Sequence, residues 1–152
     1  MPNYEDTAIT IDIDLPERQP YIYMTMARLF RRIYKYIKLI HQNICEIDID
    51  GIKAINTRKG IHIVFPIRQW LINNLDKQLL IFSLQAVMND DKRRVIYNII
   101  RYATTKKHNI KMNILWDMKV ERINDQLIIH EYSENKLLSN YIKKIVKVSM
   151  EW

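Results

Sequence analysis

The chain has 152 residues, the length of one domain, with 48% apolar residues and a net charge of +7. It has no apolar run long enough for a membrane helix, no signal-peptide pattern at the N-terminus, and one cysteine, so no internal disulfide. Two glycines are too few for a P-loop or a dinucleotide fingerprint. We therefore expect a single domain over residues 1–152, cytoplasmic and away from membranes. Its positive charge favours a nucleic-acid partner over a merely solvated basic surface.

The first predicted element is a half-buried strand over residues 9–15. Apolar Ile9, Ile11 and Ile13 alternate with polar residues, so Asp12 and Asp14 share the opposite face. Two ionised carboxylates about 7 Å apart repel by roughly 2–3 kcal/mol at an effective dielectric near 20. A divalent cation would reverse that repulsion, which makes the pair a candidate metal site.

A helix over about residues 21–42 is expected next, because its apolar residues recur at helical spacing. The apolar positions are Ile22, Met26, Leu29, Phe30, Ile33, Ile37 and Ile40, and the basic positions on the other side are Arg28, Arg31, Arg32, Lys35 and Lys38. The basic face is either a phosphate contact or a solvated surface, and the sequence favours the second.

Residues 44–55 and 60–66 are predicted to form a β-hairpin joined by residues 56–59. The apolar parity changes at Gly51, which predicts a β-bulge at that position. On the return strand Ile61, Ile63 and Phe65 face the core, so His62 faces the other way.

The remaining pattern predicts helices over residues 68–88 and 91–105, strands over 112–121 and 125–133, and a helix over 134–148. The order β-α-β-β-α-α-β-β-α is typical of an α+β fold with an antiparallel sheet, like the RNA-recognition (RRM) or polymerase-palm fold. In such a fold the helices cover one face and leave the other open. Three strands would then project Asp12, Asp14, His62 and Asp117 from the open face. Three carboxylates beside a basic group are what two-metal nucleotidyl transfer requires.

Three motifs resemble those of the archaeo-eukaryotic primase (primase-polymerase) superfamily. They are "ITIDIDLP" with Asp12 and Asp14, "NTRKGIHIVFPI" with His62, and "NILWD" with Asp117. The middle motif is similar to the corresponding segment of the polymerase domains in bacterial end-joining ligases. The resemblance covers roughly residues 8–120, and the chain departs from it where Asn56-Thr57-Arg58 replaces a glycine-rich start.

The resemblance implies a DNA primase or polymerase that acts on a single-stranded DNA template with NTPs or dNTPs. Asp12, Asp14 and Asp117 would ligate two Mg²⁺ or Mn²⁺ ions as the catalytic residues. The nucleotide phosphates would bind His62 and the turn formed by Thr57, Arg58, Lys59 and Gly60. A larger primase or replication subunit is an expected partner.

Three alternatives follow from the same residues. Arg94 and Arg101, on one helical stripe with Asn98, either contact the template or form a solvated face. The chain as a whole is either an enzyme or a non-catalytic nucleic-acid-binding or primase-accessory subunit. A rolling-circle-type endonuclease is disfavoured, because it needs a histidine pair on one strand and only His62 is present at that site. A second pair, Asp48 and Asp50, is expected to share the open face as a bystander.

Overall fold

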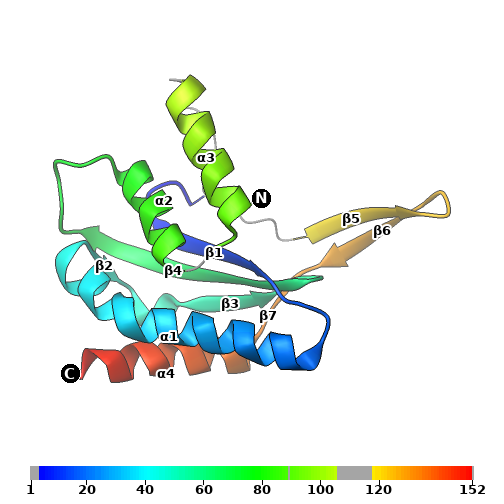
Figure 1. Ribbon diagram of the computed structural model, residues 1–152, viewed down its shortest axis with the longest axis horizontal. Coiled ribbons are helices and arrows are strands. Elements are labelled where there is room, and N and C mark those ends of the chain that lie inside the picture. The colour runs from blue at the N-terminus through cyan, green and yellow to red at the C-terminus, as the bar shows by residue number, and fades with distance from the viewer. Residues whose placement is uncertain (1–3, 89, 106–117, 152) are drawn as a thin grey trace.

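The computed structural model describes residues 4–88, 90–105 and 118–151. Its elements are β1 (Ala8–Asp14), α1 (Gln19–Asn43), β2 (Cys45–Ile47), the 3-10 helix η1 (Ile49–Gly51), β3 (Lys53–Asn56), β4 (Gly60–Trp70), α2 (Lys77–Val87), α3 (Lys92–Thr105), β5 (Met118–Ile123), β6 (Gln126–Glu131), β7 (Ser133–Glu134) and α4 (Lys136–Met150). The predicted α+β class with an antiparallel sheet is confirmed (Figure 1).

The main sheet is organised around β4. Its strand order is β1-β4-β3-β7, and β2 pairs with the far end of β4. β1 runs antiparallel to β4 along its whole length, from Ala8 opposite Pro66 to Asp14 opposite Gly60. β3 lies on the other side of β4, so the predicted hairpin is confirmed at its turn. This register fixes which side chains of β1 and β4 face each other.

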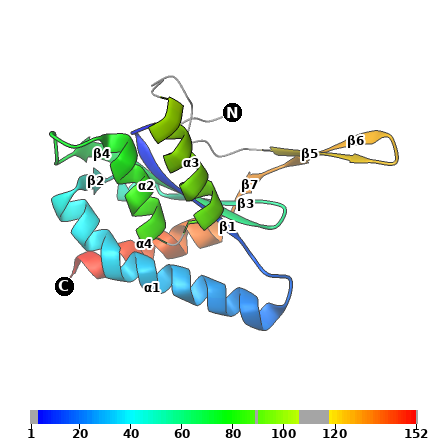
Figure 2. The same cartoon turned by 45° about the horizontal axis from the view of Figure 1, so that its top comes forward.

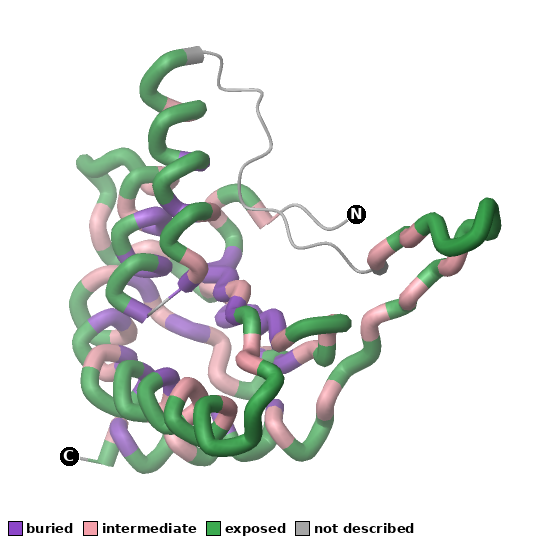
Figure 3. The backbone as a smooth tube through the Cα atoms, turned by 45° about the vertical axis from the view of Figure 1, so that its right-hand side comes forward, coloured by how far each residue is buried: buried purple, intermediate pink, exposed green. Residues whose placement is uncertain are grey.

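One face of the sheet forms the main hydrophobic core with α1 and α4 (Figures 1 and 2). The fully buried side chains of this core include Ile9, Ile11, Leu29, Ile33, Ile37, Ile63 and Phe65. They are the positions that the period-2 and helical patterns predict to face inward. Figure 3 shows the buried segments gathered on the sheet and on the helix faces beside it. In the part of the chain that the structure describes, no helix combines the length and apolar character needed to cross a bilayer.

Two predicted boundaries are wrong for local reasons. The strand predicted over 44–55 is divided by η1, where Ile52 N–H donates to Ile49 O, and no bulge forms at Gly51. The helix predicted to begin at residue 68 begins at Lys77, because β4 continues to Trp70 and pairs with β2. The Asp76 side chain caps this helix by accepting two backbone N–H groups, a signal that the apolar periodicity hides.

β5 and β6 form a separate two-stranded sheet that extends away from the main sheet (Figure 1). We call these two strands the β5–β6 arm. Asn124 and Asp125, both at positive φ, make its tight turn. Alternating sequence predicts strands but not their partner, so the prediction did not separate this hairpin from the main sheet. Only the short β7 returns to the main sheet, against β3.

Candidate functional site

Asp12 and His62 face each other across the β1–β4 pair. Asp12 Oδ1 lies 3.2 Å from His62 Nε2. The N–H and C=O of Asp12 bond instead to Asp90 and Asp91, on the edge of β1 that faces away from β4. Asp12 and His62 therefore form a non-hydrogen-bonded antiparallel pair, the type in which facing side chains come closest. The predicted placement of both residues on one face is correct. The expectation that helices leave this face open is wrong here, because Gln85 of α2 and Arg94 of α3 both contact Thr10 on it.

His62 is held by two side chains and is 6% exposed. Its Nε2 faces the Asp12 carboxylate, and the Tyr132 ring packs edge-on against it with ring centroids 5.7 Å apart. Its Nδ1 is buried and makes no hydrogen bond with any residue that the structure describes. Asp12 and Tyr132 thus fix the orientation of the imidazole ring.

The turn between β3 and β4 is fixed against the end of β1. Thr57 N–H donates to Gly60 O at 3.0 Å, Gly60 N–H donates to Thr57 Oγ1 at 2.9 Å, and Leu15 N–H donates to Lys59 O at 2.7 Å. A Cβ on Gly60 would lie 1.8 Å from Ile13 O. Gly60 therefore allows β1 and β4 to approach each other closely, and this approach brings the turn beside Asp14.

A basic pocket of about 320 Å³ lies on the turn side of the carboxylates. Its lining residues are Asp12, Asp14, Thr57, Arg58, Lys59, His62, Lys119 and Tyr132. Arg58 forms an ion pair with Glu121 of the β5–β6 arm, and Glu121 also contacts His130 Nε2 at 3.2 Å. Thr57, Arg58, Lys59 and His62 of the predicted nucleotide-binding residues therefore line one pocket, with Gly60 in the same turn. Lys119 of the arm and Tyr132, which follows β6, line the pocket as well.

An acidic pocket of about 350 Å³ lies on the other side of the same two carboxylates. Its lining residues are Asp12, Ile13, Asp14, Thr25, Asp90, Asp91 and Arg93. The pKa of Asp14 is raised by burial and by the negative charges of Asp12 and Asp91, while Lys59 and His62 act in the opposite direction. Concentrated negative charge of this kind is relieved by a bound cation.

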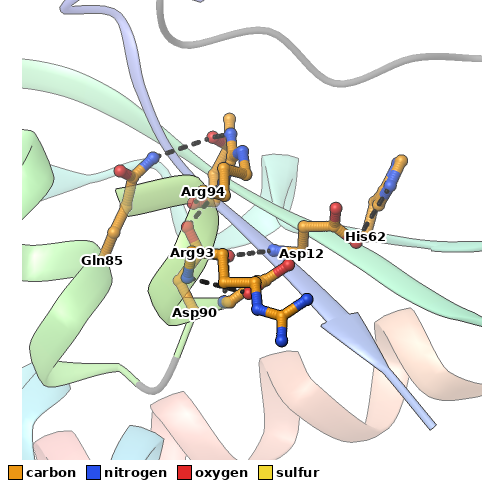
Figure 4. A network of polar contacts seen from close by, with 8 residues as sticks. Asp12, His62, Gln85, Asp90, Arg93 and Arg94 are labelled. Atoms are coloured by element: carbon orange, nitrogen blue, oxygen red, sulfur yellow. Dashed lines mark hydrogen bonds and ion pairs between the residues drawn. The ribbon is translucent and has the colours of Figure 1, made fainter. Parts of the chain in front are cut away.

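Asp90 connects the helices to the site. From the sequence, Asp90 and Asp91 are both expected to cap the helix that follows, and Asp91 does so, since its Oδ1 accepts from Arg93 N–H at 3.0 Å. Asp90 is instead buried, and its Oδ1 accepts from Asp12 N–H at 2.6 Å. Figure 4 shows Asp12 between His62 on one side and the group around Asp90 on the other. Asp90 therefore fixes the position of Asp12 along the free edge of β1.

Arg94 has partners inside the protein. It pairs with Asp90 at 2.5 Å, and its Nη2 donates to Thr10 Oγ1 at 2.8 Å, which also accepts from Gln85 Nε2. Its side chain is 14% exposed, and Asn98 of the same stripe is buried. Arg94 thus anchors α3 to β1, whereas Arg101 is exposed. A template contact by either arginine stays a prediction.

The other predicted carboxylates have different outcomes. Asp117 lies outside the described residues. Asp48 N–H donates to Pro66 O, at the end of β4 remote from His62, and Asp50 contacts Lys147 of α4 at 3.5 Å. Since α4 covers the core face, the expectation that Asp50 shares the open face is wrong. Within the described ranges, no three His, Cys, Asp or Glu side chains form a complete metal site.

Comparisons of this chain with protein-family models, with curated proteins and with solved structures found no match. The resemblance to primase-polymerases therefore stays a prediction from the three sequence motifs. Two of these motifs, around Asp12 and around His62, lie on neighbouring strands and contact each other.

The position of Asp90 predicts a pH-dependent stability. Burial raises its pKa to about 6, against the opposing effects of the Arg94 guanidinium and the N–H groups of Asp12 and Asp91. Because this pKa lies above the usual 3.8, the folded state binds the proton more tightly than the unfolded state. The resulting stabilisation is complete below about pH 4 and is lost as the pH rises through about 6.

We expect the difference in unfolding free energy between wild type and Asp90→Asn to depend on pH in this window. From pH 4 to 6 the wild-type value should fall relative to the variant by up to about 1.4 kcal/mol per pH unit, since the variant has no proton to lose there. Urea unfolding at four or five pH values measures both. A relative slope of opposite sign would mean that the Arg94 ion pair outweighs burial.

Proposed function

We propose that the protein is a primase-polymerase-like nucleotidyltransferase that extends or begins a strand on single-stranded DNA. The observation that carries this proposal is the place of Asp12 and Asp14, between a basic pocket with His62 and an acidic pocket. A triphosphate would bind on one side of the two carboxylates, and the reacting strand would approach from the other side. The proposal includes that β1 and β4, the strand that carries His62, are arranged like the corresponding strands of a polymerase-palm fold.

The donor set fits a hard divalent cation such as Mg²⁺ or Mn²⁺. Asp12 and Asp14 supply carboxylate oxygens, the ligands that these ions prefer. The pKa of Asp14 is raised first by burial and then by the nearby charges of Asp12 and Asp91. Asp117 would be the third ligand by the resemblance. Two ions held there would stabilise the negative charge on the attacking and leaving oxygens.

The protein's own residues would bind and orient the reactants. Lys59, Lys119 and His62 offer positive or hydrogen-bonding groups to a triphosphate in the basic pocket, and the backbone N–H groups of a turn suit phosphate oxygens. A 3′-hydroxyl from the acidic side would attack the α-phosphate and release its proton to water. One P–O bond would form while the bond to the β-phosphate breaks and pyrophosphate leaves. The pairing of Arg58 with Glu121 ties the triphosphate pocket to the β5–β6 arm.

Primer synthesis and extension by the purified protein test this proposal. We expect labelled products with a single-stranded DNA template, Mn²⁺ or Mg²⁺, and either NTPs or dNTPs, and none when the metal is chelated. A product that forms equally without divalent metal, or no product with any nucleotide set, contradicts it.

A non-catalytic nucleic-acid-binding or primase-accessory subunit is the second candidate. The engagement of His62 inside the protein favours it, because His62 is 6% exposed and its Nε2 faces Asp12. It predicts template binding that does not respond to Mn²⁺ and no heat of Mn²⁺ binding in calorimetry. Metal binding that disappears with Asp12 and Asp14 would exclude it.

A further inference from the structure

The outward surface of α1 carries a groove with basic walls, which we call the arginine groove. It encloses about 370 Å³ and is lined by Arg28, Arg31, Arg32, Lys35 and Tyr36. Arg32 Nη1 reaches Val87 O at 3.5 Å, and Lys35 Nζ stands 5.2 Å from the Tyr36 ring. In the described part of the chain, no carboxylate pairs with any of the four cations. The groove therefore presents positive charge that the fold leaves uncompensated.

The arginine groove and the acidic pocket are both lined by residues of α1. Thr25 of α1 lines that pocket together with Asp12 and Asp14. Arg28 and Arg32 follow Thr25 by three and seven residues, so all three lie on one side of the helix. Arg32 contacts the backbone of Val87 at the end of α2, a few residues before Asp90 in the sequence. This side of α1 therefore faces the end of α2 (Figure 2). One surface thus leads from the two carboxylates along α1.

We infer that the path from Arg93 in the acidic pocket, over Arg28 and Arg32, to Lys35 binds the phosphate backbone of a single nucleic-acid strand. This inference rests on the proposed function, which makes the acidic pocket the place where the end of the strand reacts. The turn on the other side of Asp12 and Asp14 is then left to the incoming triphosphate. The strand and the nucleotide approach the carboxylates from opposite sides.

The dimensions of the helix suit this ligand. At a rise of 1.5 Å per residue, Thr25 and Lys35 are about 15 Å apart along α1, and Arg28 and Lys35 about 10 Å. One strand of a duplex carries a phosphate about every 3.4 Å of axis. The basic side chains therefore match a run of several successive phosphates, whereas a single free phosphate would leave most of the groove unused.

An anionic membrane is the other ligand with repeated negative charge, and the structure disfavours it. Membrane-surface helices insert an apolar face opposite their basic face. In α1 that face is Leu29, Ile33, Ile37 and Ile40, all buried in the core. A helix that cannot expose its apolar face offers a bilayer only its charges.

The test is binding of fluorescent single-stranded DNA without metal or nucleotide, measured by anisotropy over a range of salt concentrations. For the double variant Arg28→Ala/Arg32→Ala we expect the slope of log K against log salt to fall in magnitude by about 1.4, since each lost phosphate contact on a single strand contributes about 0.7. Extrapolated from 1 M salt, this slope corresponds to about 25-fold weaker binding at 0.1 M. Arg28→Lys/Arg32→Lys should restore most of the slope, because point charges suffice for phosphate.

The matched control is Lys143→Ala/Lys144→Ala on α4, which removes the same charge at residues that line neither the arginine groove nor the acidic pocket. The control should bind nearly as the wild type. Equal losses in both double variants would show that only net charge matters and would overturn the inference. So would unchanged DNA binding in the arginine variant, or anionic vesicles bound through these arginines while DNA is not.

The failure of the proposed function is recognised separately. Asp12→Ala/Asp14→Ala should bind single-stranded DNA at least as tightly as wild type in this assay, since it removes two negative charges. If wild type makes no product but the salt slope still depends on Arg28 and Arg32, catalysis is wrong and the strand path stands. If product forms but the slope does not change, the strand path is wrong and catalysis stands.

Discussion

Replacing Asp12 and Asp14 together with alanine should reduce metal-dependent nucleotide addition by at least about 1000-fold. Stabilising transition-state charge through bound metal supplies several kcal/mol, and about 4 kcal/mol of lost stabilisation is roughly a factor of 1000 in rate. The rate of primer extension at saturating template measures the effect. Calorimetry should show that Mn²⁺ binding is lost in the same variant.

The fold should survive this double substitution. Asp12 is held in the sheet by its backbone, since its N–H and C=O bond to Asp90 and Asp91, and alanine keeps both groups. The Asp14 side chain is exposed and repelled by Asp12 and Asp91. Removing these carboxylates relieves repulsion but also takes away the partner of the buried His62 Nε2, two effects of opposite sign on stability. Circular dichroism should therefore show an unchanged spectrum at the temperature of the assay.

The chain contains its own matched control for this experiment. Asp48 and Asp50 repeat the same Asp-Ile-Asp sequence, but Asp48 pairs with Arg68 and Asp50 with Lys147, away from His62. Asp48→Ala/Asp50→Ala should keep nearly full activity. If both pairs reduce activity equally, or if loss of Asp12 and Asp14 leaves it unchanged, the site is not where the geometry places it.

The parts of this site that sequence predicts are those set by short-range periodicity. Alternation on β1 and β4 assigns Asp12, Asp14 and His62 to one face, and the hairpin turn brings Lys59 beside them. Each assignment needs only the parity of one strand and one register. The same reasoning locates α1 and its basic face, because the helical repeat defines an apolar side and hence an outward side.

The parts that escaped prediction depend on contacts between distant segments. Asp90 looks like a helix-capping residue, and its role appears only when the α2–α3 connection lies along the edge of β1, 78 residues away in sequence. Lys119 at the start of β5 and Tyr132 just after β6 line the basic pocket because β5 and β6 pair with each other. Alternation alone does not distinguish this pairing from a strand in the main sheet. Asp117 lies outside the described residues, so its predicted place beside Asp12 stays a prediction.

Gly60 supports the site through the backbone, and its substitution should have the largest effect on stability. In Gly60→Ala the added Cβ would meet the Ile13 carbonyl at 1.8 Å, and both belong to backbone that cannot turn aside. The β1–β4 pair would have to separate at the position of Asp14. We expect a loss of about 3 kcal/mol in unfolding free energy, at the upper end of the usual cost of overpacking. That corresponds to a fall of about 6–12 °C in melting temperature for a protein of this size.

Gly51→Ala is the control, because the two glycines differ only in what surrounds them. Neither has positive φ, so an alanine costs no backbone strain at either position. The nearest atom to a Cβ on Gly51 is Asp48 Oδ2 at 2.7 Å, the far end of a side chain that can rotate. Gly51→Ala should therefore change the unfolding free energy by less than about 1 kcal/mol. Urea unfolding compares the two, and equal effects would contradict the close approach of β1 and β4. Because that approach also sets the distance between Asp14 and the turn proposed to bind phosphate, Gly60→Ala should lose activity even at temperatures where it remains folded.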